Sequence, residues 1–327
     1  MRYTQLGQTD LQVSRISYGA WQAGGDWGGD ERELRVAVRR ARELGVNFFD
    51  TAQAYGWGAS EKLLGEVLAD ELANRRDEIV ISTKSGVRAE GSKRVRDASA
   101  EFLRAGIEDS LRNLGVDHLD LFYVHWPTPD TTPFEETAQA LDDFVREGKT
   151  RYVGVSNYSV DDMADFERHR KIDVLQPPYH VFRRDAERDV FPYCREHGIG
   201  TQIYGPMAHG LLTGKFSKGR EFEQGDWRRD HPLFETEAFE RNIDAVEALA
   251  RWASERGCTV AQLAVAWTLH HPAVDTAIVG VRKPEHIEGT APAAELDLSD
   301  DDLRQIDEIA ESAGAMAMSG PTPEARK

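Results

Sequence analysis

The stretch from Asn47 to Gly58 reads NFFDTAQAYGWG and passes from an apolar run into a glycine-rich loop. Asp50 stands where the apolar run Val46 to Phe49 stops, and Tyr55 follows it on the loop. Parallel α/β proteins place their chemistry at the carboxyl ends of the strands, so Asp50 is expected at the mouth of a strand. A carboxylate and a phenol this close suit proton transfer, provided that neighbouring groups shift the protonation of the phenol.

Short β-rich runs alternate with amphipathic helical stretches, such as Asp30 to Gly45, along most of the chain. Successive βα units favour a closed parallel barrel, and a hairpin from Tyr3 to Val13 is expected to cap its lower end. The expected fold is therefore α/β, a single (β/α)8 TIM barrel with an N-terminal β-hairpin cap and extra C-terminal helices. Its eight strands are expected to start at Ile16, Val46, Ile79, Leu119, Tyr152, Val174, Gly200 and Thr276.

An open, doubly wound sheet is the alternative architecture. No G-x-G-x-x-G follows any expected strand, so the dinucleotide-binding fingerprint of that fold is missing. The barrel is expected to span residues 1–312, and the Pro, Ser and charge content of residues 313–327 predicts a flexible C-terminal tail. Residues 205–236 lack clear periodicity, and an irregular segment of this length is typical of a functional loop.

The composition narrows the class of protein. The chain has 327 residues with 40 basic and 57 acidic side chains, a formal net charge of −17, which argues against unspecific binding to nucleic acid or an anionic membrane. The acidic surplus is explained either by a salt-rich cytoplasm or by biased base composition. The start of the chain lacks the pattern of a signal peptide, and no apolar stretch approaches membrane-spanning length. Cys194 and Cys258 have no disulfide or metal spacing, so a reducing cytoplasm is the expected location and no metal site is expected.

Titratable side chains follow three of the expected strands. Asp50, Lys84 and His125 stand at strand ends, and Tyr55 hangs from the loop after Asp50. Because strand ends of a barrel meet on one face, the four groups are expected to gather there. Singly, Lys84 is explained as a surface amine, His125 as a structural histidine and Asp50 as a cap. Burying all four together is costly without a function, which favours a catalytic site.

Each of these groups has a physical role in such a site. A free tyrosine titrates near ~10, so Tyr55 needs a nearby cation, which Lys84 can provide. Asp50 would keep Lys84 protonated and oriented. His125 could hydrogen-bond a carbonyl oxygen of the substrate as negative charge develops there. The site would then donate a proton to an oxygen while another group supplies a nucleophile to carbon.

Four motifs closely resemble the aldo-keto reductases, in particular bacterial and archaeal members similar to the channel-β-subunit-like and general-stress-protein-like branches. The motifs are FDTAQAYGWGASE at 49–61, STK at 82–84, DLFYVHWP at 120–127 and GVSNY at 154–158. The resemblance covers the chain from about Leu6 to Thr290, with the motifs in family order. It implies that a nicotinamide supplies hydride, and that the protein reduces an aldehyde or ketone, with sugars among the candidates. Its implied catalytic tetrad is Asp50, Tyr55, Lys84 and His125.

The resemblance also implies a binding site for the nicotinamide. Ser156, Asn157 and Gln176 match the residues that hold the carboxamide, and Tyr204 matches the ring that stacks on the nicotinamide. Strand-end caps and core packing are the ordinary alternatives for these residues. The segment 205–215 resembles the loop that covers the pyrophosphate, with Gly205, Pro206, Met207 and Lys215 as its implied contacts.

The adenosine end of the cofactor is implied at Gly280, Arg282 and His286. Arg282 can pair bidentately with a 2′-phosphate and stack on adenine, so NADP(H) is favoured and NAD(H) is the alternative. Two departures from the family pattern reduce the adenine contacts. His286 stands where similar proteins often have Gln or Arg, and Gly289-Thr290 replaces the usual Glu-Asn pair.

The substrate is expected to be a small carbonyl or alcohol compound. Trp21, Trp57 and Trp126 come from three loops of the same mouth and are the candidate substrate contacts, with plain packing as the alternative. The irregular stretch Lys215 to Pro232 also carries Arg220, Trp227, Arg228 and Arg229. Two other functions stay open: a nicotinamide-binding regulatory subunit with little turnover, and an aldolase that uses Lys84 as a Schiff-base nucleophile.

Overall fold

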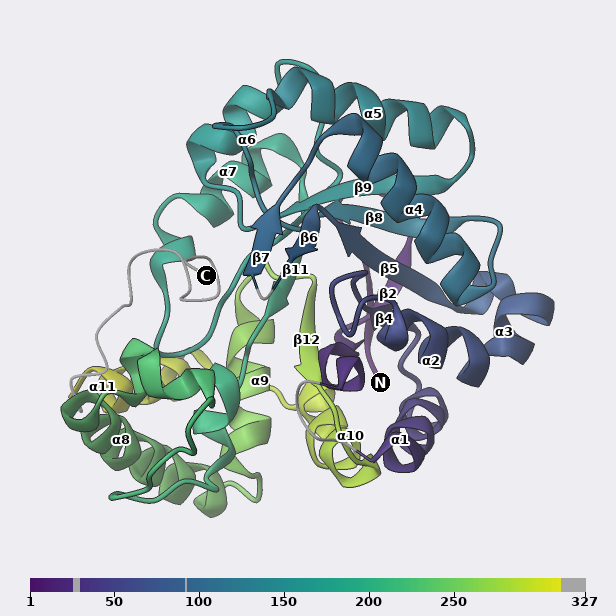
Figure 1. The fold of residues 1–327 in the computed structure, drawn as a ribbon. Coiled ribbons are helices and arrows are strands. Elements are labelled where there is room, and N and C mark those ends of the chain that lie inside the picture. The colour runs from purple at the N-terminus through teal and green to yellow at the C-terminus, as the bar shows by residue number, and fades with distance from the viewer. Residues whose placement is uncertain (26–29, 92, 313–327) are drawn as a thin grey trace.

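The computed structural model describes residues 1–25, 30–91 and 93–312, so the expected tail at 313–327 lies outside the described residues. Eight parallel strands close into a barrel (Figure 1), as the sequence predicted. Closure is made by pairing of the last barrel strand with the first, since Ala277 to Gly280 runs beside Ile16 to Gly19. The strands are β3 (Ile16–Gly19), β4 (Phe48–Asp50), β5 (Val80–Ser85), β8 (Leu119–Val124), β9 (Thr150–Ser156), β10 (Val174–Gln176), β11 (Gly200–Tyr204) and β12 (Thr276–Gly280).

Helices surround the barrel and pack their apolar faces on its outer surface. Several begin at side-chain caps: Asp30 and Ser99 each accept a backbone N–H, and Thr259 forms a capping box with Gln262. The helices are α1 (Glu31–Glu43), α2 (Ala59–Val67), α3 (Ala69–Asn74), α4 (Ala100–Leu114), α5 (Phe134–Arg146), α6 (Val160–Phe166), α7 (Val190–His197), α8 (Thr236–Glu255), α9 (Val260–His270), α10 (Pro284–Thr290) and α11 (Asp300–Ser312).

Two helix starts are set by local contacts. Helix α2 begins at Ala59 after Gly58, which has φ 96°, and the hydroxyl of Ser60 donates to the carbonyl of Ala20 at 2.8 Å. The stretch from Asp185 to His197 is not one helix. A 3-10 turn ends at Glu187, and α7 starts afresh after Asp189, whose carboxylate accepts the N–H of Val190.

Alternate residues of each strand point into the barrel. The inward residues are apolar at the lower end, which the hairpin closes, and polar toward the open mouth. The lower layer includes Phe48, Val80, Leu121 and Val174. The hairpin of β1 (Tyr3–Gln5) and β2 (Gln12–Ser14) closes this end with Leu6, Leu11 and Val13. The next inward positions, above that layer, are occupied by polar and charged side chains, so the strand pattern itself directs them toward the open mouth.

The hairpin turn fits against the barrel only with glycine. Gly7 has φ 53°, and a Cβ added there would lie 2.4 Å from the backbone nitrogen of Gly200. Such a distance is far below a normal contact, so a larger residue would push the hairpin off β11. The cap at the lower end therefore depends on this close approach.

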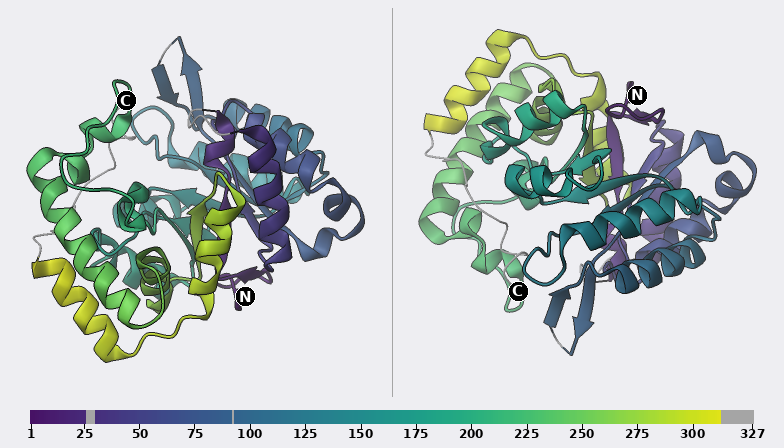
Figure 2. Two further views of the ribbon diagram at one scale, coloured as in Figure 1. Left: turned by 90° about the horizontal axis from the view of Figure 1, so that it is seen from below. Right: turned by 90° about the horizontal axis from the view of Figure 1, so that it is seen from above.

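A second hairpin was not expected from the sequence. Strands β6 (Val87–Glu90) and β7 (Lys93–Arg96) pair antiparallel directly after β5, and Figure 2 shows them projecting away from the barrel. The alternation is obscured in β7, whose sequence KRVR places charged residues on both faces of the strand. The loop after β11 is irregular, as expected, and contains the 3-10 turns η4 (Ala208–Thr213), η5 (Trp227–Asp230) and η6 (Pro232–Phe234).

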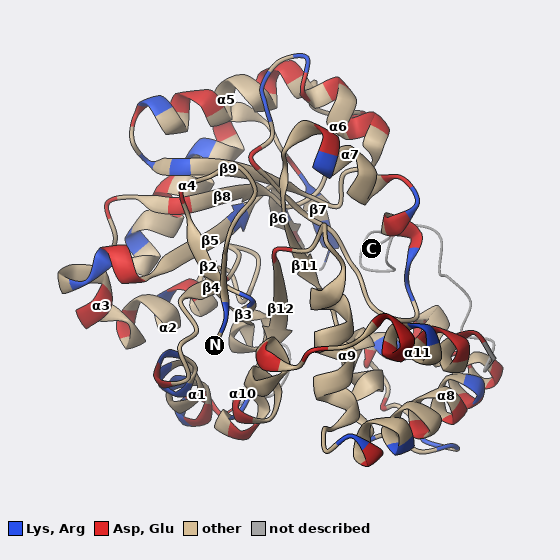
Figure 3. Cartoon of the chain, turned by 180° about the vertical axis from the view of Figure 1, so that it is seen from behind, with Lys and Arg blue, Asp and Glu red and all other residues tan. Residues whose placement is uncertain are grey.

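Acidic and basic residues are interspersed along the surrounding helices (Figure 3). Helix α8 illustrates the division: Phe239, Ile243 and Leu249 are buried against the body of the protein, while Glu237 and Glu240 are exposed. Among the helices of the described ranges, none combines the length and the apolar character needed to cross a membrane.

Candidate active site

A buried ion pair lies at the centre of the barrel mouth. Lys84 Nζ donates to Asp50 Oδ2 at 2.7 Å and to the carbonyl of Thr51 at 2.8 Å. The side chain of Lys84 is 0% exposed and that of Asp50 is 3% exposed. The register of the strands places the two residues of the pair: β4 pairs with β5 so that Asp50 lies opposite Ser82, two residues before Lys84. The amine therefore reaches back to the carboxylate from the next inward position.

Asp50 is held by more than the lysine. Its Oδ1 accepts from Ser82 Oγ and from Gln176 Nε2, each at 2.9 Å. Gln176 also donates at 2.9 Å to Gln202, which accepts the Tyr123 hydroxyl at 2.7 Å. A polar layer thus crosses the barrel and fixes the carboxylate. Sequence reasoning missed Tyr123 and Gln202, although their positions on β8 and β11 are inward by strand alternation.

Burial and charge act in opposite directions on Lys84. Desolvation lowers the pKa of the ammonium below its usual value, while the nearby Asp50 and Glu61 carboxylates favour the charged form. Glu61 is itself fully buried and accepts bonds from Thr83 and Ser110 at 2.6 Å each and from Asn113 at 2.9 Å. The two carboxylates therefore offset much of the cost of placing a cation in the barrel.

Tyr55 lies above this pair. Lys84 Nζ is 5.3 Å from the centroid of the Tyr55 ring. The His125 ring meets that of Tyr55 edge-on, with centroids 5.9 Å apart. His125 is positioned by its backbone, whose N–H donates to Ser85 at 2.9 Å at the end of β5. The structure thus brings together Asp50, Tyr55, Lys84 and His125, the four groups that the sequence singled out.

His125 is held in its neutral form. Burial lowers the pKa of the imidazole well below its ordinary value, and Lys84, Arg94 and Arg96 lower it further. Its Nδ1 is buried and has no hydrogen-bond partner among the described residues. A neutral imidazole carries one N–H donor and one acceptor, so His125 can donate a hydrogen bond to a carbonyl oxygen without itself giving up a proton.

A second group of polar residues surrounds Tyr204 at the end of β11. Tyr204 donates its hydroxyl proton to Asn157 Oδ1 at 2.8 Å, and Asn157 Nδ2 donates to the His125 carbonyl at 3.1 Å. Asn157 has φ 64°, a left-handed conformation that asparagine tolerates better than most residues. Ser156 Oγ lies 3.0 Å from Asn157 Nδ2 and donates to the Gln176 carbonyl at 3.0 Å. Asn157 therefore links Tyr204 directly to the strand end that carries His125.

The loop after Tyr204 has an unusual backbone. Gly205 and Gly210 have φ 71° and 95°, and Ala208 and His209 have φ 47° and 57°. Left-handed residues other than glycine are strained and cluster at ligand-binding segments. Pro206 is buried and Met207 half-buried, so the loop is anchored on one side, while Lys215 at its end is exposed.

Basic side chains gather near the end of β12. The N–H of Arg282 donates to His286 Nδ1 at 3.3 Å. Burial and the positive charges of Lys215 and Arg282 lower the pKa of His286. Gly280 lets Gln22 approach, since a Cβ at Gly280 would lie 2.5 Å from its Nε2. Lys215 and Arg282 therefore act on a common histidine although they come from different loops.

The donor set fits a dinucleotide. At one end, the Asn157 amide accepts the hydroxyl of the partly exposed Tyr204 and lies beside Ser156 Oγ, a set that suits a flat heterocycle with a carboxamide. At the other end, the cations Lys215 and Arg282 suit phosphates. The glycine at 205 leaves space, because an added Cβ there would meet no atom within 4 Å. The residues present are therefore compatible with a bound nicotinamide cofactor.

The three tryptophans predicted as substrate contacts occupy different environments. Trp21 lies beside Tyr55, with ring centroids 6.3 Å apart. Trp126 follows His125 and lies under Arg96, whose guanidinium carbon is 4.3 Å from the ring. Trp57 is 49% exposed on its loop. A fourth tryptophan, Trp227 of η5 in the irregular stretch, lies 6.3 Å from Trp21 between ring centroids.

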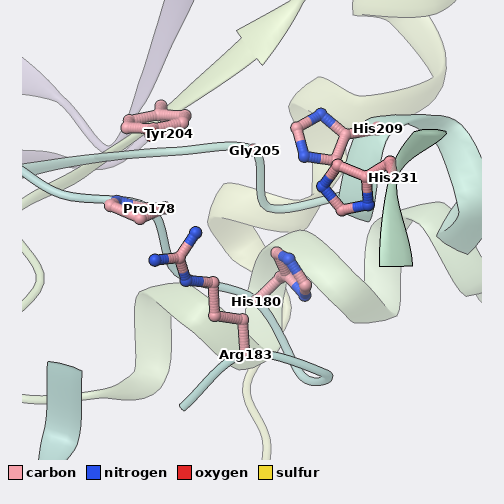
Figure 4. A pocket seen from close by; sticks show the side chains of 7 residues that line it. All are labelled: Pro178, His180, Arg183, Tyr204, Gly205, His209 and His231. Carbon is pink, nitrogen blue, oxygen red and sulfur yellow. The ribbon is translucent and has the colours of Figure 1, made fainter. Parts of the chain in front are cut away.

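A small cavity lies beside Tyr204 and Gly205 and was not expected. Figure 4 shows the Arg183 side chain reaching toward Pro178 and Gly205, with the rings of His209 and His231 side by side. The centroids of these two rings are 4.8 Å apart. His180 completes the lining. Within the described ranges, no three His, Cys, Asp or Glu side chains are arranged to hold a metal ion.

Residues 15–311 match the model of the aldo/keto reductase family. The chain is 36% identical to "Aldo-keto reductase YhdN" of Bacillus subtilis, with 99% of each chain covered. It is 31% identical to "NADH-specific methylglyoxal reductase" of Escherichia coli, covering 95% of this chain and 99% of that one. It is also 32% identical to "Probable voltage-gated potassium channel subunit beta" of Oryza sativa, covering 88% and 89%.

Among solved structures, the glycerol dehydrogenase AKR11B4 from Gluconobacter oxydans superposes with a TM-score of 0.89. The two sequences are 32% identical, and 98% of each chain is covered. The match therefore extends over the barrel, its hairpin cap and the surrounding helices.

Proposed function

Because the chain belongs to the aldo/keto reductase family, we propose that it reduces an aldehyde or ketone to the alcohol, with NADPH as the favoured cofactor. The observation that carries the proposal is the arrangement around Lys84. Its Nζ lies 2.7 Å from Asp50 Oδ2 and 5.3 Å from the centroid of the Tyr55 ring, with the His125 ring edge-on to the phenol.

In this proposal the bound nicotinamide supplies hydride to the carbonyl carbon. Tyr55 donates its phenolic proton to the carbonyl oxygen as negative charge develops there. The ammonium of Lys84 favours the phenolate that remains, and Asp50 holds that ammonium in place. Neutral His125 donates a hydrogen bond to the same oxygen and so orients the carbonyl toward Tyr55.

The nicotinamide would be held at the inner end of the site. Ser156, Asn157 and Gln176 would hold the carboxamide, and the ring of Tyr204 would cover one face of the nicotinamide. The backbone from Gly205 to Met207, together with Lys215, would bind the diphosphate. These assignments are supported by the cluster around Tyr204 and by the strained loop that follows it.

The preference for NADPH rests on Arg282. Its side chain is exposed, its backbone N–H donates to His286, and a guanidinium can pair with a 2′-phosphate through two parallel hydrogen bonds. A relative that is 31% identical is named as NADH-specific, so the preference varies between related chains and has to be measured for this one.

The lowered pKa of Lys84 also favours a second chemistry, because a lysine of low pKa can act as a Schiff-base nucleophile. The geometry disfavours it. Nζ is bonded to Asp50 and to Thr51 and is shielded from solvent, so no carbonyl carbon reaches it without breaking the ion pair. Reduction with Tyr55 as the acid is the better supported function.

The test uses the purified full chain with NADPH or NADH and a panel of aldehydes and ketones. We expect loss of nicotinamide absorbance with at least one carbonyl compound, and its near abolition by Tyr55→Phe. Absence of turnover across the panel, together with tight cofactor binding, would contradict the proposal and favour a regulatory subunit. Borohydride trapping of a carbonyl on Lys84 without any nicotinamide would instead support the aldolase chemistry.

A further inference from the structure

The polar layer inside the barrel holds the side-chain amide of Gln176 by both of its N–H groups. Gln176 is the last residue of β10, and its Nε2 lies 2.9 Å from Asp50 Oδ1 and 2.9 Å from Gln202 Oε1. All three side chains are buried. Because a primary amide carries only two N–H groups, these two bonds use its whole donor capacity inside the barrel. The NH2 group of Gln176 therefore faces inward.

The orientation of this amide follows from its partners. The carboxylate of Asp50 offers only acceptor atoms, since it is paired with the ammonium of Lys84 at 2.7 Å. An amide oxygen against it would place two acceptors face to face, so the Gln176 atom at 2.9 Å must be the nitrogen. Asp50 does not fix the amide alone, because Ser82 and Lys84 already donate to it. The second acceptor, on Gln202, is needed as well.

The side-chain carbonyl oxygen Oε1 of Gln176 lies on the other side of the amide carbon from these two bonds. Among the described residues no donor bonds this oxygen, and protein atoms do not enclose it completely. The backbone carbonyl of Gln176 accepts Ser156 Oγ at 3.0 Å and the N–H of Asn157 at 3.3 Å, the other two residues assigned to the carboxamide. Oε1 is therefore an acceptor that the protein leaves to a ligand.

Gln202 is itself fixed, from the far side of the barrel. Its Oε1 also accepts the hydroxyl of Tyr123 on β8 at 2.7 Å, and its Nε2 lies 3.3 Å from Ser17 Oγ on β3. Burial and the charge of Asp50 raise the pKa of Tyr123 well above its ordinary value, so the hydroxyl keeps its proton and stays a donor. Gln202 therefore presents its oxygen, not its nitrogen, to Gln176.

The ordinary explanation for such a layer is structural, because buried polar groups need partners and the inward positions of a barrel have to be filled. Apolar side chains fill those positions in the layer below, at Val80, Leu121 and Val174. A satisfied polar layer has little advantage in stability over an apolar one of the same shape, because its groups must first lose water. What it adds is a unique orientation for each amide.

We propose that Gln202 and Tyr123 are positioning residues for the nicotinamide cofactor: they commit the NH2 group of Gln176 to the barrel interior and so direct its Oε1 toward the N–H of the carboxamide. The inference rests on the proposed function, in which Gln176 holds that group. It adds two residues that act on the cofactor only through Gln176. That amide also joins the two ends of the site, since it bonds the carboxylate that holds Lys84.

The test compares two oxidised nucleotides that differ at one group. NADP⁺ carries a carboxamide, and its 3-acetylpyridine analogue carries a methyl ketone, which keeps the oxygen and lacks the N–H groups. Isothermal titration calorimetry on the purified full chain gives the dissociation constant of each. The ratio of the two constants measures how strongly the protein recognises the carboxamide N–H. The same pair without the 2′-phosphate serves if NAD⁺ binds more tightly.

Three variants remove the polar layer in steps: Gln202→Met, Tyr123→Phe and the double variant. Tyr123→Phe keeps the ring, whose centroid is 5.9 Å from Lys84 Nζ, and removes only the hydroxyl. The matched control is Thr276→Val. Thr276 is also a buried polar residue of a barrel strand, but its hydroxyl donates at 2.8 Å to the carbonyl of Ser14, in the hairpin that closes the other end. Melting temperatures are recorded for every variant.

We expect the wild-type protein to bind NADP⁺ roughly three- to tenfold more tightly than the analogue, the range of one neutral hydrogen bond. In Gln202→Met the ratio should fall close to one, because the amide of Gln176 loses one of its two acceptors and can turn an N–H toward the mouth. Tyr123→Phe should give a ratio between these two values. Thr276→Val should keep the wild-type ratio even where it lowers the melting temperature.

The double variant separates orientation from stability. Replacing both partners of a buried hydrogen bond by apolar groups restores part of the stability that a single replacement loses. Its melting temperature should therefore lie above that of Gln202→Met, while its ratio stays close to one. A ratio that recovers together with the melting temperature would show a structural role for the layer and overturn the inference.

Two further results would contradict it: a wild-type ratio of one, or the wild-type ratio in Gln202→Met and in the double variant. If either occurs while NADP⁺ binds and carbonyl compounds are reduced, the inference fails and the reductase function stands. If the wild-type protein binds neither nucleotide, with or without the 2′-phosphate, both fail.

Discussion

Lys84 Nζ and Asp50 Oδ2 lie 2.7 Å apart in the interior of the barrel, and both side chains are almost completely shielded from water. Removing one partner of such a pair leaves an uncompensated buried charge, whereas removing both leaves none. The contribution of the pair to the free energy of unfolding can therefore be measured separately from its role in proton transfer.

We expect Lys84→Met and Asp50→Asn each to lower the free energy of unfolding by about 3–5 kcal/mol. The double variant should lose less than the sum of the two, because neither charge is then left alone. Urea unfolding measures all three. The exposed pair Arg104–Glu147 provides the control, since Arg104→Gln should cost less than about 1 kcal/mol. Strict additivity of the two buried changes would show that they do not interact.

Tyr55→Phe should lower kcat for carbonyl reduction by roughly a hundred- to ten-thousandfold, the range that a positioned acid contributes. Cofactor binding should be unchanged, because the hydroxyl is assigned to the substrate oxygen. Tyr158→Phe is a matched control: Tyr158 is buried, and its hydroxyl has no hydrogen-bond partner among the described residues. Near wild-type kcat for Tyr55→Phe would assign the proton to another group.

His125 should remain neutral across the working pH range. Because its pKa is lowered well below the ordinary value, the proton has already left at a pH where a free imidazole is still charged. The pH profile of kcat/KM should therefore show no inflection near about 6.5 that His125→Gln removes. The ring C–H resonances of His125, followed by NMR, should not shift between about pH 5.5 and 8. A titration inside that window would show that Lys84, Arg94 and Arg96 act more weakly than the structure indicates.

Much of the fold followed from the sequence because strand ends and helical spacing are local patterns. Asp50, Lys84 and His125 were identified because each stands at the end of an apolar run, and barrel topology then brings them together. The cross-barrel hydrogen bonds of Gln202 were not identified. A polar side chain inside a short strand gives the same sequence pattern whether it faces a layer of polar partners or a helix.

Other parts were missed for different physical reasons. Strand β7 of the second hairpin has charged residues on both faces, so strand alternation is absent from its sequence. The lining of the small cavity comes from separate loops: Arg183 and His231 are 48 positions apart by number, and only the fold places them side by side. Irregular backbone of this kind leaves no periodic signal to read.

The histidines of that cavity should make the protein sensitive to acid. Burial and the neighbouring positive charges lower the pKa of His209 to about 3. Burial and Arg183 lower the pKa of His231 to about 4. The pKa of His180 is also lowered, well below its ordinary value. An unfolded histidine titrates near about 6.5, so on acidification the unfolded chain takes up protons before the folded one. The stability that these groups contribute is therefore present above about pH 6.5 and is lost as the pH falls toward 4.

We expect this loss to reach roughly 1–2 kcal/mol per histidine between about pH 6.5 and 5. Urea unfolding at pH 7.5, 6.5 and 5 measures it. His231→Gln should reduce the slope of stability against pH, whereas replacement of the exposed His169 should leave that slope unchanged. An identical slope in His231→Gln would exclude that residue as a source of the acid sensitivity.

Arg282 should discriminate between the two nicotinamide cofactors. Its side chain is exposed after the end of β12 and is assigned to the adenosine end of the cofactor, so its effect on binding should depend on whether the cofactor carries a 2′-phosphate. Arg282→Ala should weaken NADPH binding by roughly ten- to a hundredfold, the range of a charged hydrogen bond, and leave NADH binding unchanged. Arg282→Lys should keep the charge but lose the bidentate geometry, so its affinity for NADPH should fall between those of the wild-type protein and Arg282→Ala.

Cofactor fluorescence titrations measure each dissociation constant without a substrate. Lys283→Ala is the control, because that neighbouring amine already pairs with Glu33 at 2.9 Å. Equal weakening of NADPH and NADH by Arg282→Ala would show that the guanidinium stacks on adenine and reads no phosphate.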